Sequence, residues 1–277
     1  EYSTDNGGNW TIINNTYAGV EGANNYSWIV PDRKSQQCVV RVSDNRTAFT
    51  NEVTDTSNAT FSIRPQINIS DPVLGANVFA NSNAAPIRWA YTGSTIQKVN
   101  VDYSTNDGIN WTNIETNVTV ANGSTYVWPL VPALTTTTGR IRVYDISNAN
   151  VNSTSQRFNI VGSLRLIAPN GAENWPVGTS QYIIWDAYAV NLVNLSYSLN
   201  NGSSWNNVTT NFPAANETYL WPIPNTTQIS NNALIKIEDI SNPSVSYDAS
   251  NNTFALLATI DKTAPENGNV VIAEQPY

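Results

Sequence analysis

Three aspartates recur at one point of a repeated strand pattern, where their carboxylates could supply oxygen ligands to a calcium ion. They are Asp44, Asp145 and Asp239, and each directly follows a run of alternating apolar and polar residues. Calcium takes about six to eight oxygen ligands, so a site would need several such groups at one pole of a domain. The alternative is that each carboxylate accepts hydrogen bonds from backbone N–H groups of its own turn. The pattern favours the turn role over calcium.

Other chemistry has few residues to carry it. The chain has no histidine and a single cysteine, Cys38, so the commonest metal ligands and general bases are missing. Cys38 aligns with Gly139 and Ala233 in the repeats described below, which predicts a buried small side chain rather than a nucleophile. We therefore expect no catalytic residue, no cofactor, no enzyme activity and no disulfide within the chain.

Composition narrows the class of protein further. Hydrophobic residues make up 40% and charged residues 12% of the 277 residues, which excludes a disordered chain. The net charge is −8 and the 13 Lys and Arg residues are scattered, so a nucleic-acid partner is not expected. The sequence has no run of about 18 apolar residues, so a transmembrane helix is not expected either.

Asparagine is unusually common. There are 41 of these residues, and 16 begin an Asn-x-Ser/Thr sequon, about twice the number that composition alone predicts. The excess could also arise because Asn, Ser and Thr crowd into the same turns. We expect N-linked glycosylation of several sequons, which places the chain outside the cell or at the cell surface. The candidate sites are Asn9, Asn14, Asn25, Asn45, Asn58, Asn68, Asn110, Asn117, Asn122, Asn152, Asn194, Asn201, Asn207, Asn216, Asn225 and Asn251.

Internal repetition determines the architecture, because four landmarks recur three times in the same order. They are a hairpin segment from Tyr to Trp, an aromatic segment ending in Pro, an alternating strand ending in Asp, and a closing Phe segment. The hairpin segment spans 2–10, 103–111 and 197–205, and the aromatic segment spans 26–31, 126–129 and 219–222. The alternating strand spans 39–44, 140–145 and 234–239, and the closing Phe segment spans 61–63, 158–160 and 254–256. Alternation of apolar residues with period two predicts strands, and clusters of Asn, Gly, Ser and Pro predict turns.

About seven short strands per repeat, without helical periodicity, predict an all-β fold of tandem immunoglobulin-like β-sandwich domains. The second and third repeats carry opening strands, near 86–91 and 182–187, that the first repeat does not show. The first domain is therefore expected to be incomplete. The expected divisions are a truncated domain, two whole domains and a tail, at 1–64, 65–161, 162–257 and 258–277.

The tryptophans follow the repeat. Eight of the nine occupy repeat-equivalent positions, which favours a shared role in the cores over a sugar-binding surface. Trp175 stands alone, so it is the candidate for stacking on a carbohydrate.

The third repeat resembles a known group of domains. It carries Ala-Pro-Asn-Gly-Ala-Glu-Asn-Trp-Pro-Val-Gly-Thr at 168–179, Ile-Trp at 184–185, Tyr-Leu-Trp-Pro at 219–222, and Phe254. These motifs are similar to immunoglobulin-like repeats of prokaryotic secreted and cell-surface proteins, related in pattern to the Kre9/KNH-type domain of fungal wall proteins. The resemblance is weaker in the second repeat. It implies a structural, wall-associated or adhesive role in tandem arrays and carries no catalytic residues.

The segment from Ser3 to Trp10 also resembles the Asp box of sialidases, although Asn106 and Asn200 replace its aspartate in the later repeats. That motif is a β-hairpin device in which a polar side chain bonds local backbone and a tryptophan packs beneath. A sialidase would need more closely spaced boxes, an arginine cluster and a tyrosine–acid pair, so this resemblance does not imply an enzyme.

The tail carries opening-strand material, because 260–268 is similar to 166–171. Val270, Val271, Ile272 and Ala273 are predicted to form a strand. A sandwich that lacks strands exposes sheet edges, and the tail of one copy could cover those of the next. Such a head-to-tail contact does not close and so builds a filament. The alternative is an excerpt from a longer array. The tail has no counterpart of the Ile-Ile-Trp strand, so a composite domain would still lack one strand.

The sequence thus predicts a structural subunit of an extracellular glycosylated filament, sheath or surface array, with another copy of itself as the partner. One alternative is an adhesin or carbohydrate-binding tandem module of a longer cell-surface protein, whose partners would be glycans and neighbouring repeats. Another is an accessory region of a secreted enzyme. Self-association, glycan binding and inert monomeric behaviour would separate the three.

Overall fold

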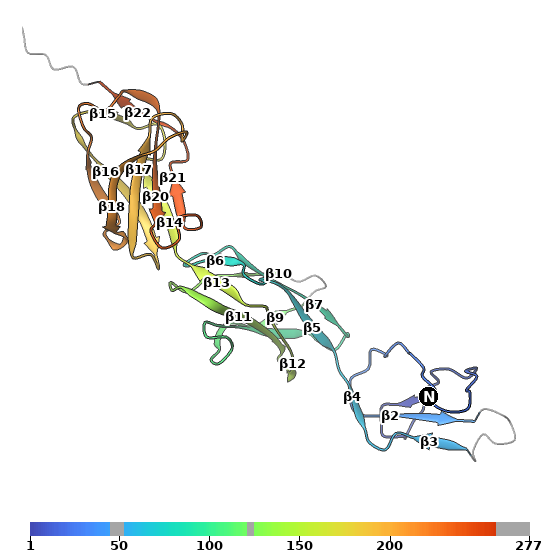
Figure 1. Cartoon of the computed structure of the whole chain (residues 1–277). Helices are drawn as coiled ribbons and strands as arrows, with labels where there is room; N and C mark the ends of the chain where they lie inside the picture. Colours follow the sequence, from blue (N-terminus) through green and yellow to red (C-terminus); the bar gives the residue numbers. More distant parts are fainter. Residues whose placement is uncertain (45–52, 121–124, 259–277) are drawn as a thin grey trace, which may run out of the picture. The chain divides into compact units, whose positions relative to one another are not determined.

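The computed structural model describes residues 1–44, 53–120 and 125–258, which are almost entirely β-strands and turns (Figure 1). They fall into two compact units. The first holds residues 1–77, 83–129 and 136–159, and the second holds 78–82, 130–135 and the chain from 160 onward. Within the described residues, no helix is long and apolar enough to span a membrane. The strands repeat in three sets, which we call the first, second and third copies.

The third copy is a two-layer β-sandwich. Its strands are Ser163–Ala168 (β14), Asn174–Pro176 (β15), Ser180–Tyr188 (β16), Leu192–Ser198 (β17), Asn206–Pro213 (β18), Thr218–Pro222 (β19), Ser230–Asp239 (β20), Tyr247–Ala249 (β21) and Phe254–Leu257 (β22). One sheet has the order β14-β16-β19, and the other has the order β15-β22-β20-β17-β18 with β21 beside β20. The strand β15 runs parallel to β22, whereas the other pairs are antiparallel.

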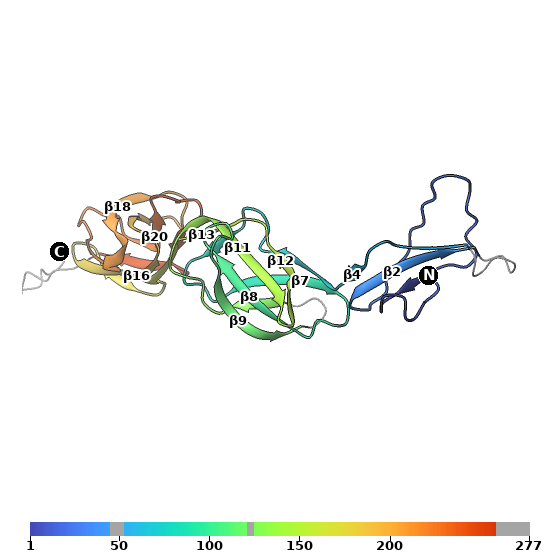
Figure 2. The same cartoon turned by 90° about the horizontal axis from the view of Figure 1, so that it is seen from below.

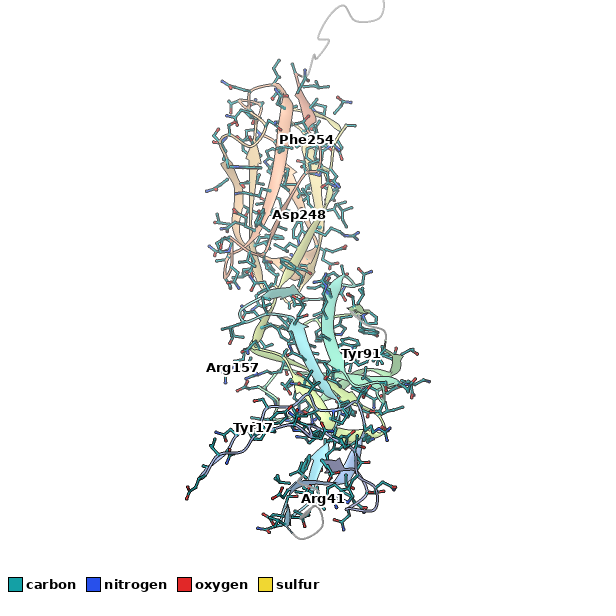
Figure 3. The ribbon with its side chains drawn as sticks, turned by 90° about the vertical axis from the view of Figure 1, so that its right-hand side faces the viewer. Tyr17, Arg41, Tyr91, Arg157, Asp248 and Phe254 are labelled. Carbon is teal, nitrogen blue, oxygen red and sulfur yellow. The ribbon has the colours of Figure 1, made fainter. Side chains whose placement is uncertain are left out.

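Side chains from both sheets of the third copy meet in one core. Trp185 and Trp221 come from the three-stranded sheet, and Ile235 and Phe254 come from the other. Figure 3 shows Phe254 between the strands of this copy. The burial of these large apolar side chains is the main source of the stability of the sandwich.

The second copy repeats this arrangement. Its strands are Gln66–Asp71 (β5), Asn77–Phe79 (β6), Ala85–Thr92 (β7), Lys98–Ser104 (β8), Thr112–Thr119 (β9), Thr125–Trp128 (β10), Thr136–Asp145 (β11), Asn148–Thr154 (β12) and Phe158–Val161 (β13). The sheets have the orders β10-β7-β5 and β6-β13-β11-β8-β9, with β12 beside β11. Figure 2 shows β8, β9, β11 and β12 side by side. Each strand from β5 to β13 therefore has a counterpart from β14 to β22 in the same order.

The strands follow the alternation in the sequence. Along β11, Gly139, Ile141 and Val143 are buried, whereas Arg140 and Arg142 between them are partly exposed. Successive side chains of a strand point to opposite faces, so this pattern fixes which face joins the core. The prediction of an all-β fold with tandem immunoglobulin-like sandwiches is confirmed.

The described residues of the first copy form one sheet. Its strands are Tyr2–Ser3 (β1), Ser35–Ser43 (β2), Thr54–Thr56 (β3) and Phe61–Ile63 (β4), and the first, third and fourth all pair antiparallel with β2. By sequence they match β8, β11, β12 and β13. Within the described part of 1–64, no strand matches β5, β6, β7 or β10. The first copy is therefore incomplete, as the sequence predicts.

Candidate assembly site

Each copy closes its hairpin with the same hydrogen bonds. In the first copy, the buried Ser3 Oγ accepts bonds from the N–H groups of Asp5 (3.2 Å) and Gly7 (2.9 Å). Asp5 Oδ1 accepts one from the N–H of Asn9 (2.7 Å). The same bonds recur in the other copies, where the pairs are Ser104–Asn106 and Ser198–Asn200. Asparagine can replace aspartate because the bond requires only a side-chain oxygen acceptor.

The aspartate makes the first hairpin sensitive to acid. The hydrogen bond from Ser3, with further bonds from Asn9, lowers the pKa of Asp5 to about 2. Because this folded-state pKa is below the unfolded value, the stability that the carboxylate contributes is present above about pH 4 and is lost as the pH falls towards 2. We expect an NMR titration of the Asp5 carboxyl to have its midpoint near pH 2. A midpoint near 4 would contradict these hydrogen bonds, and Asp5→Asn is the matched variant without the titration.

A cation stacks on the hairpin tryptophan of every copy. In the first copy, the Arg41 guanidinium lies 4.0 Å from the Trp10 ring centroid, and its Nη2 lies 2.6 Å from Glu1 Oε2 (Arg41 is labelled in Figure 3). In the second copy Arg142 stacks on Trp111 and forms an ion pair with Asp102. In the third copy Lys236 stacks on Trp205. These contacts occupy a ring face within each copy, so the hairpin tryptophans serve the scaffold.

In the whole copies, three backbone hydrogen bonds hold the opening segment at one end of the sandwich. In the third copy, the Val177 N–H donates to the Leu257 carbonyl and the Gly178 N–H donates to the Ile223 carbonyl, each at 2.9 Å. The Ile223 N–H donates to the Thr179 carbonyl, also at 2.9 Å. We call these three bonds the opening clamp. In the second copy they join Ala80 to Val161, Asn81 to Val131 and Val131 to Ser82.

The first copy contains only the receiving half of the opening clamp. Val30 corresponds to Val131 and Ile223, because each directly precedes a proline after the aromatic segment. Arg64 lies three residues after Phe61, as the acceptor carbonyls of the whole copies follow their own closing phenylalanines. Over the described residues, no hydrogen bond reaches the backbone of Val30 or the carbonyl of Arg64. These backbone groups are therefore available to another strand.

Side chains at the same positions are uncovered. Val30 is 55% exposed, whereas Val131 and Ile223 are 0% and 2% exposed. Phe61 is 36% exposed, whereas the closing phenylalanines of the whole copies are 0% and 1% exposed. Apolar side chains beside unpaired backbone groups form a surface to which a strand can add. We call this surface the open face, and it consists of Val30, Phe61 and Arg64.

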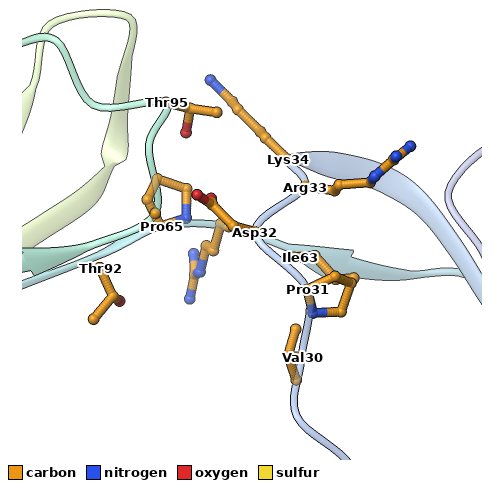
Figure 4. Close-up of a pocket in the computed structure, with 11 residues that line it drawn as sticks. Val30, Pro31, Asp32, Arg33, Lys34, Ile63, Pro65, Thr92 and Thr95 are labelled. Carbon is orange, nitrogen blue, oxygen red and sulfur yellow. The ribbon is translucent and has the colours of Figure 1, made fainter. Parts of the chain in front are cut away.

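A pocket of about 260 Å³ lies at one end of the open face (Figure 4). Its walls include Val30, Ile63 and Arg64, and its remaining lining residues are Pro31, Asp32, Arg33, Lys34, Pro65, Thr92, Gly93 and Thr95. The Ser94 N–H donates to both carboxylate oxygens of Asp32, at 2.8 and 3.0 Å. The pocket therefore combines an apolar wall with charged groups at its rim.

The recurrent aspartates lie in turns. Asp145 is buried and accepts bonds from the N–H and the Oγ–H of Ser147, both at 2.9 Å. Asp239 accepts a bond from the N–H of Ser241 at 2.9 Å, and Asp44 is half-buried just after β2. Across the described parts of the chain, no three His, Cys, Asp or Glu residues gather as metal ligands would. The geometry shown is that of turn acceptors, and calcium binding stays a prediction.

Two other candidates are buried. Cys38 on β2 is a free thiol with no exposed surface. Trp175 on β15 is 8% exposed, and its ring lies 5.0 Å from that of Phe254 and 6.3 Å from that of Trp221. The interpretation of Trp175 as a sugar-stacking residue is therefore wrong. It is a core residue, because β15 adds beside β22 and turns this side chain inward.

Most predicted glycosylation sites are accessible. Twelve of the asparagines are exposed, namely Asn9, Asn25, Asn58, Asn68, Asn110, Asn117, Asn152, Asn201, Asn207, Asn216, Asn225 and Asn251. Asn14 and Asn194 are half-buried, and Asn194 Oδ1 accepts a bond from the Asn211 N–H (3.1 Å). Asn45 and Asn122 lie outside the described residues. Glycosylation requires a free, accessible amide, so it stays a prediction for the exposed group above all.

The predicted assembly strand, Val270 to Ala273, lies outside the described residues. Its sequence nevertheless resembles a described segment, because 265–275 aligns without a gap to 72–82. A proline, a glycine, a valine and an alanine coincide, and the alanine is Ala80, the first donor of the opening clamp in the second copy. The predicted strand therefore corresponds to β6.

Sequence reasoning missed the opening clamp. Its bonds join backbone groups, so they impose no side-chain motif. The one available signal is the apolar residue before a proline, which recurs as Val30, Val131 and Ile223. Val177 and Ala80 are equivalent donors of the opening clamp, which places Trp175 on β15 level with Val78 on β6.

Comparisons with known proteins find only distant structural likenesses. No family model matches the sequence, and no curated protein matches it. The chain is similar to the fibronectin(III)-like modules of Clostridium thermocellum CbhA, with 12% identity and a TM-score of 0.28, covering 73% of this chain and 100% of that one. It is similar to the FN1-FN3 domains of chicken CNTN1, with 15% identity and a TM-score of 0.27, covering 72% of this chain and 63% of that one.

It is also similar to the N-terminal four Ig domains of Dscam1 isoform 1.9, with 9% identity and a TM-score of 0.29, covering 80% of this chain and 54% of that one. At such low identities and TM-scores these likenesses carry no argument about this chain. Function must be argued from the residues of this chain.

Proposed function

We propose that the chain is a structural subunit of an extracellular glycosylated filament, sheath or surface array, joined head to tail by strand donation. Residues 258–277 of one copy add an opening segment to the incomplete first domain of the next. The observation that carries the proposal is the open face, whose uncovered groups match the receiving half of the opening clamp. The tail carries the sequence of the other half.

The whole copies indicate how the donated strand would add. The strand β15 runs parallel to β22 and brings Trp175 onto Phe254. In the tail, Val271 takes the position of Trp175, and in the first copy Phe61 takes the position of Phe254. Parallel addition beside β4 therefore places Val271 on the exposed Phe61 and gives the open backbone groups their partners. Donor and acceptor are different surfaces of the chain, so the contact repeats without closing.

The extracellular setting is supported by the sequons. Twelve candidate asparagines are exposed on the described surface, which suits a protein whose loops are covered by glycans. The absence of an internal disulfide leaves stability to the packed cores, which the second and third copies provide.

The test is assembly of the purified full chain, followed by light scattering and electron microscopy. We expect filaments or oligomers from the full chain and none from Val271→Asp or from a chain that lacks 258–277. Ile272→Asp is the matched control, because its counterpart Phe79 faces solvent and this variant should still assemble. Polymers that persist without the tail, or a full chain that stays monomeric at high concentration, would overturn the proposal.

A carbohydrate-binding module of a longer cell-surface protein is the second candidate. A depression of about 380 Å³ on the second copy is lined by Trp111, Arg142, Tyr144, Ala149, Asn152 and Thr154. Aromatic rings beside polar side chains suit sugars. However, Arg142 lies 4.5 Å and 5.0 Å from the two ring centroids, so it already occupies part of both faces. Strand donation has the stronger support.

A further inference from the structure

Three cations without an ion pair lie around the pocket at the end of the open face. Among the described residues, seven Lys and Arg side chains form ion pairs with acids. The remaining described cations are Arg33, Lys34, Arg64 and Lys98. The first three line the pocket, and Figure 4 shows Arg33 and Lys34 reaching outward from its rim. We call these three residues the cationic rim.

The local charge is opposite to that of the chain. The net charge of the chain is −8, yet the rim carries three positive side chains and one acid, Asp32. The Asp32 carboxylate already accepts a bond from the Ser94 N–H. Arg33, Lys34 and Arg64 are exposed. Neighbouring cations without an ion pair attract an anionic group, and an acidic segment is the complementary partner.

The opening clamp identifies the residue that would reach this pocket. In the whole copies, the counterpart of Val30 accepts a bond from the N–H of Asn81 or of Gly178. The gapless alignment of the tail with 72–82 places Glu274 at the position of Asn81. The donated segment therefore brings a carboxylate to the wall formed by Val30 and Arg64.

We propose, resting on the strand donation above, that Glu274 of one copy binds the cationic rim of the next and fixes the register of the donated strand. Register needs such a device, because a slip of one residue would turn Val271 outward and Ile272 inward. Two valines and an isoleucine in a row give little preference between the two registers. A carboxylate that meets cations in only one register supplies that preference.

The backbone at this position is demanding but accessible to glutamate. Asn81 and Gly178 adopt left-handed conformations, with φ of 58° and 77°. Residues with a Cβ rarely do so, yet Glu217 adopts φ of 55° in the third copy. The ion pair with the rim stabilises this conformation in the assembled state.

The test is a charge exchange in the full chain, with assembly measured as the critical concentration. We expect Glu274→Lys and Arg64→Glu each to raise it about tenfold or more, and the chain that carries both changes to recover most of the loss. Salt should raise the critical concentration of the unaltered chain. Lys98→Glu is the matched control, because Lys98 also lacks an ion pair but lies away from the pocket.

The outcomes separate this inference from the proposed function. Assembly that depends on Val271 but is indifferent to Glu274→Lys and Arg64→Glu would overturn the cationic rim and leave strand donation intact. Assembly that is independent of Val271 would overturn both. Thermal unfolding of each variant provides the control for folding, and Arg33→Glu is the second acceptor variant if Arg64→Glu lowers stability.

Discussion

Phe158→Ala is expected to lower the free energy of unfolding of the second copy by about 3–5 kcal/mol, whereas Phe61→Ala should cost about 1 kcal/mol in the unassembled chain. The two phenylalanines are repeat-equivalent, so the difference isolates their surroundings. Phe158 is completely buried, and its removal leaves a cavity that the sandwich cannot fill. Phe61 is 36% exposed, so its ring has already lost part of the contact that the whole copies provide.

The measurement is native-state hydrogen exchange, which reports each copy separately where a single unfolding transition would not. Phe254→Ala is the matched control, since this ring is as buried as Phe158. In the proposed assembly the donated strand would cover the Phe61 ring, so assembly should increase the cost of Phe61→Ala. Equal costs at positions 61 and 158 in the unassembled chain would show that the first copy is already closed.

Much of the fold could be predicted because the same pattern of strands and turns recurs in the sequence of each copy. The alternation along β11 fixes its inner face, and the same alternation at the matching positions of β2 and β20 removes ambiguity. The hairpins can also be predicted, because Ser, Asn and Gly at this spacing are typical of a tight turn. In the structure, Ser104 Oγ accepts bonds from the N–H groups of Asn106 and Gly108.

The open face could be predicted only in outline. The sequence shows that the first copy has no counterpart of β7, but not which surface this leaves uncovered. That depends on pairing between distant strands, such as β15 with β22, and on backbone bonds such as that from Val177 to Leu257. Non-local contacts of this kind have no local side-chain pattern from which they can be read.

The positions of the unpaired cations could also be predicted only in part. The sequence shows 13 scattered cations and no basic patch. Folding pairs most of them, for example Arg140 and Arg157 with Asp107, which lowers the pKa of that carboxyl. Arg33 and Lys34 are far from Arg64 in the sequence but line the same pocket in the structure. The cationic rim therefore becomes visible only once the folded structure shows which cations stay unpaired. A local positive site can therefore exist in an acidic chain without a basic segment.

Trp175→Ala is expected to lower the free energy of unfolding of the third copy by about 3–5 kcal/mol. The ring is 8% exposed and contacts both Phe254 and Trp221, so alanine leaves a large cavity between the sheets. Trp175→Phe should recover much of the loss, because it keeps an aromatic ring against Phe254. Hydrogen exchange in the third copy provides the measurement.

Trp175→Ala also distinguishes a core role of this residue from a role in carbohydrate binding. If the chain binds glycans on an array, Trp111→Ala in the depression of the second copy should reduce binding while Trp175→Ala leaves it unchanged in chains that remain folded. Loss of glycan binding in a folded Trp175→Phe variant would contradict the core role assigned here. In the proposed assembly Val271 would take the place of Trp175, so the cost of Trp175→Ala also measures how much an inward side chain at this position contributes to closing a copy.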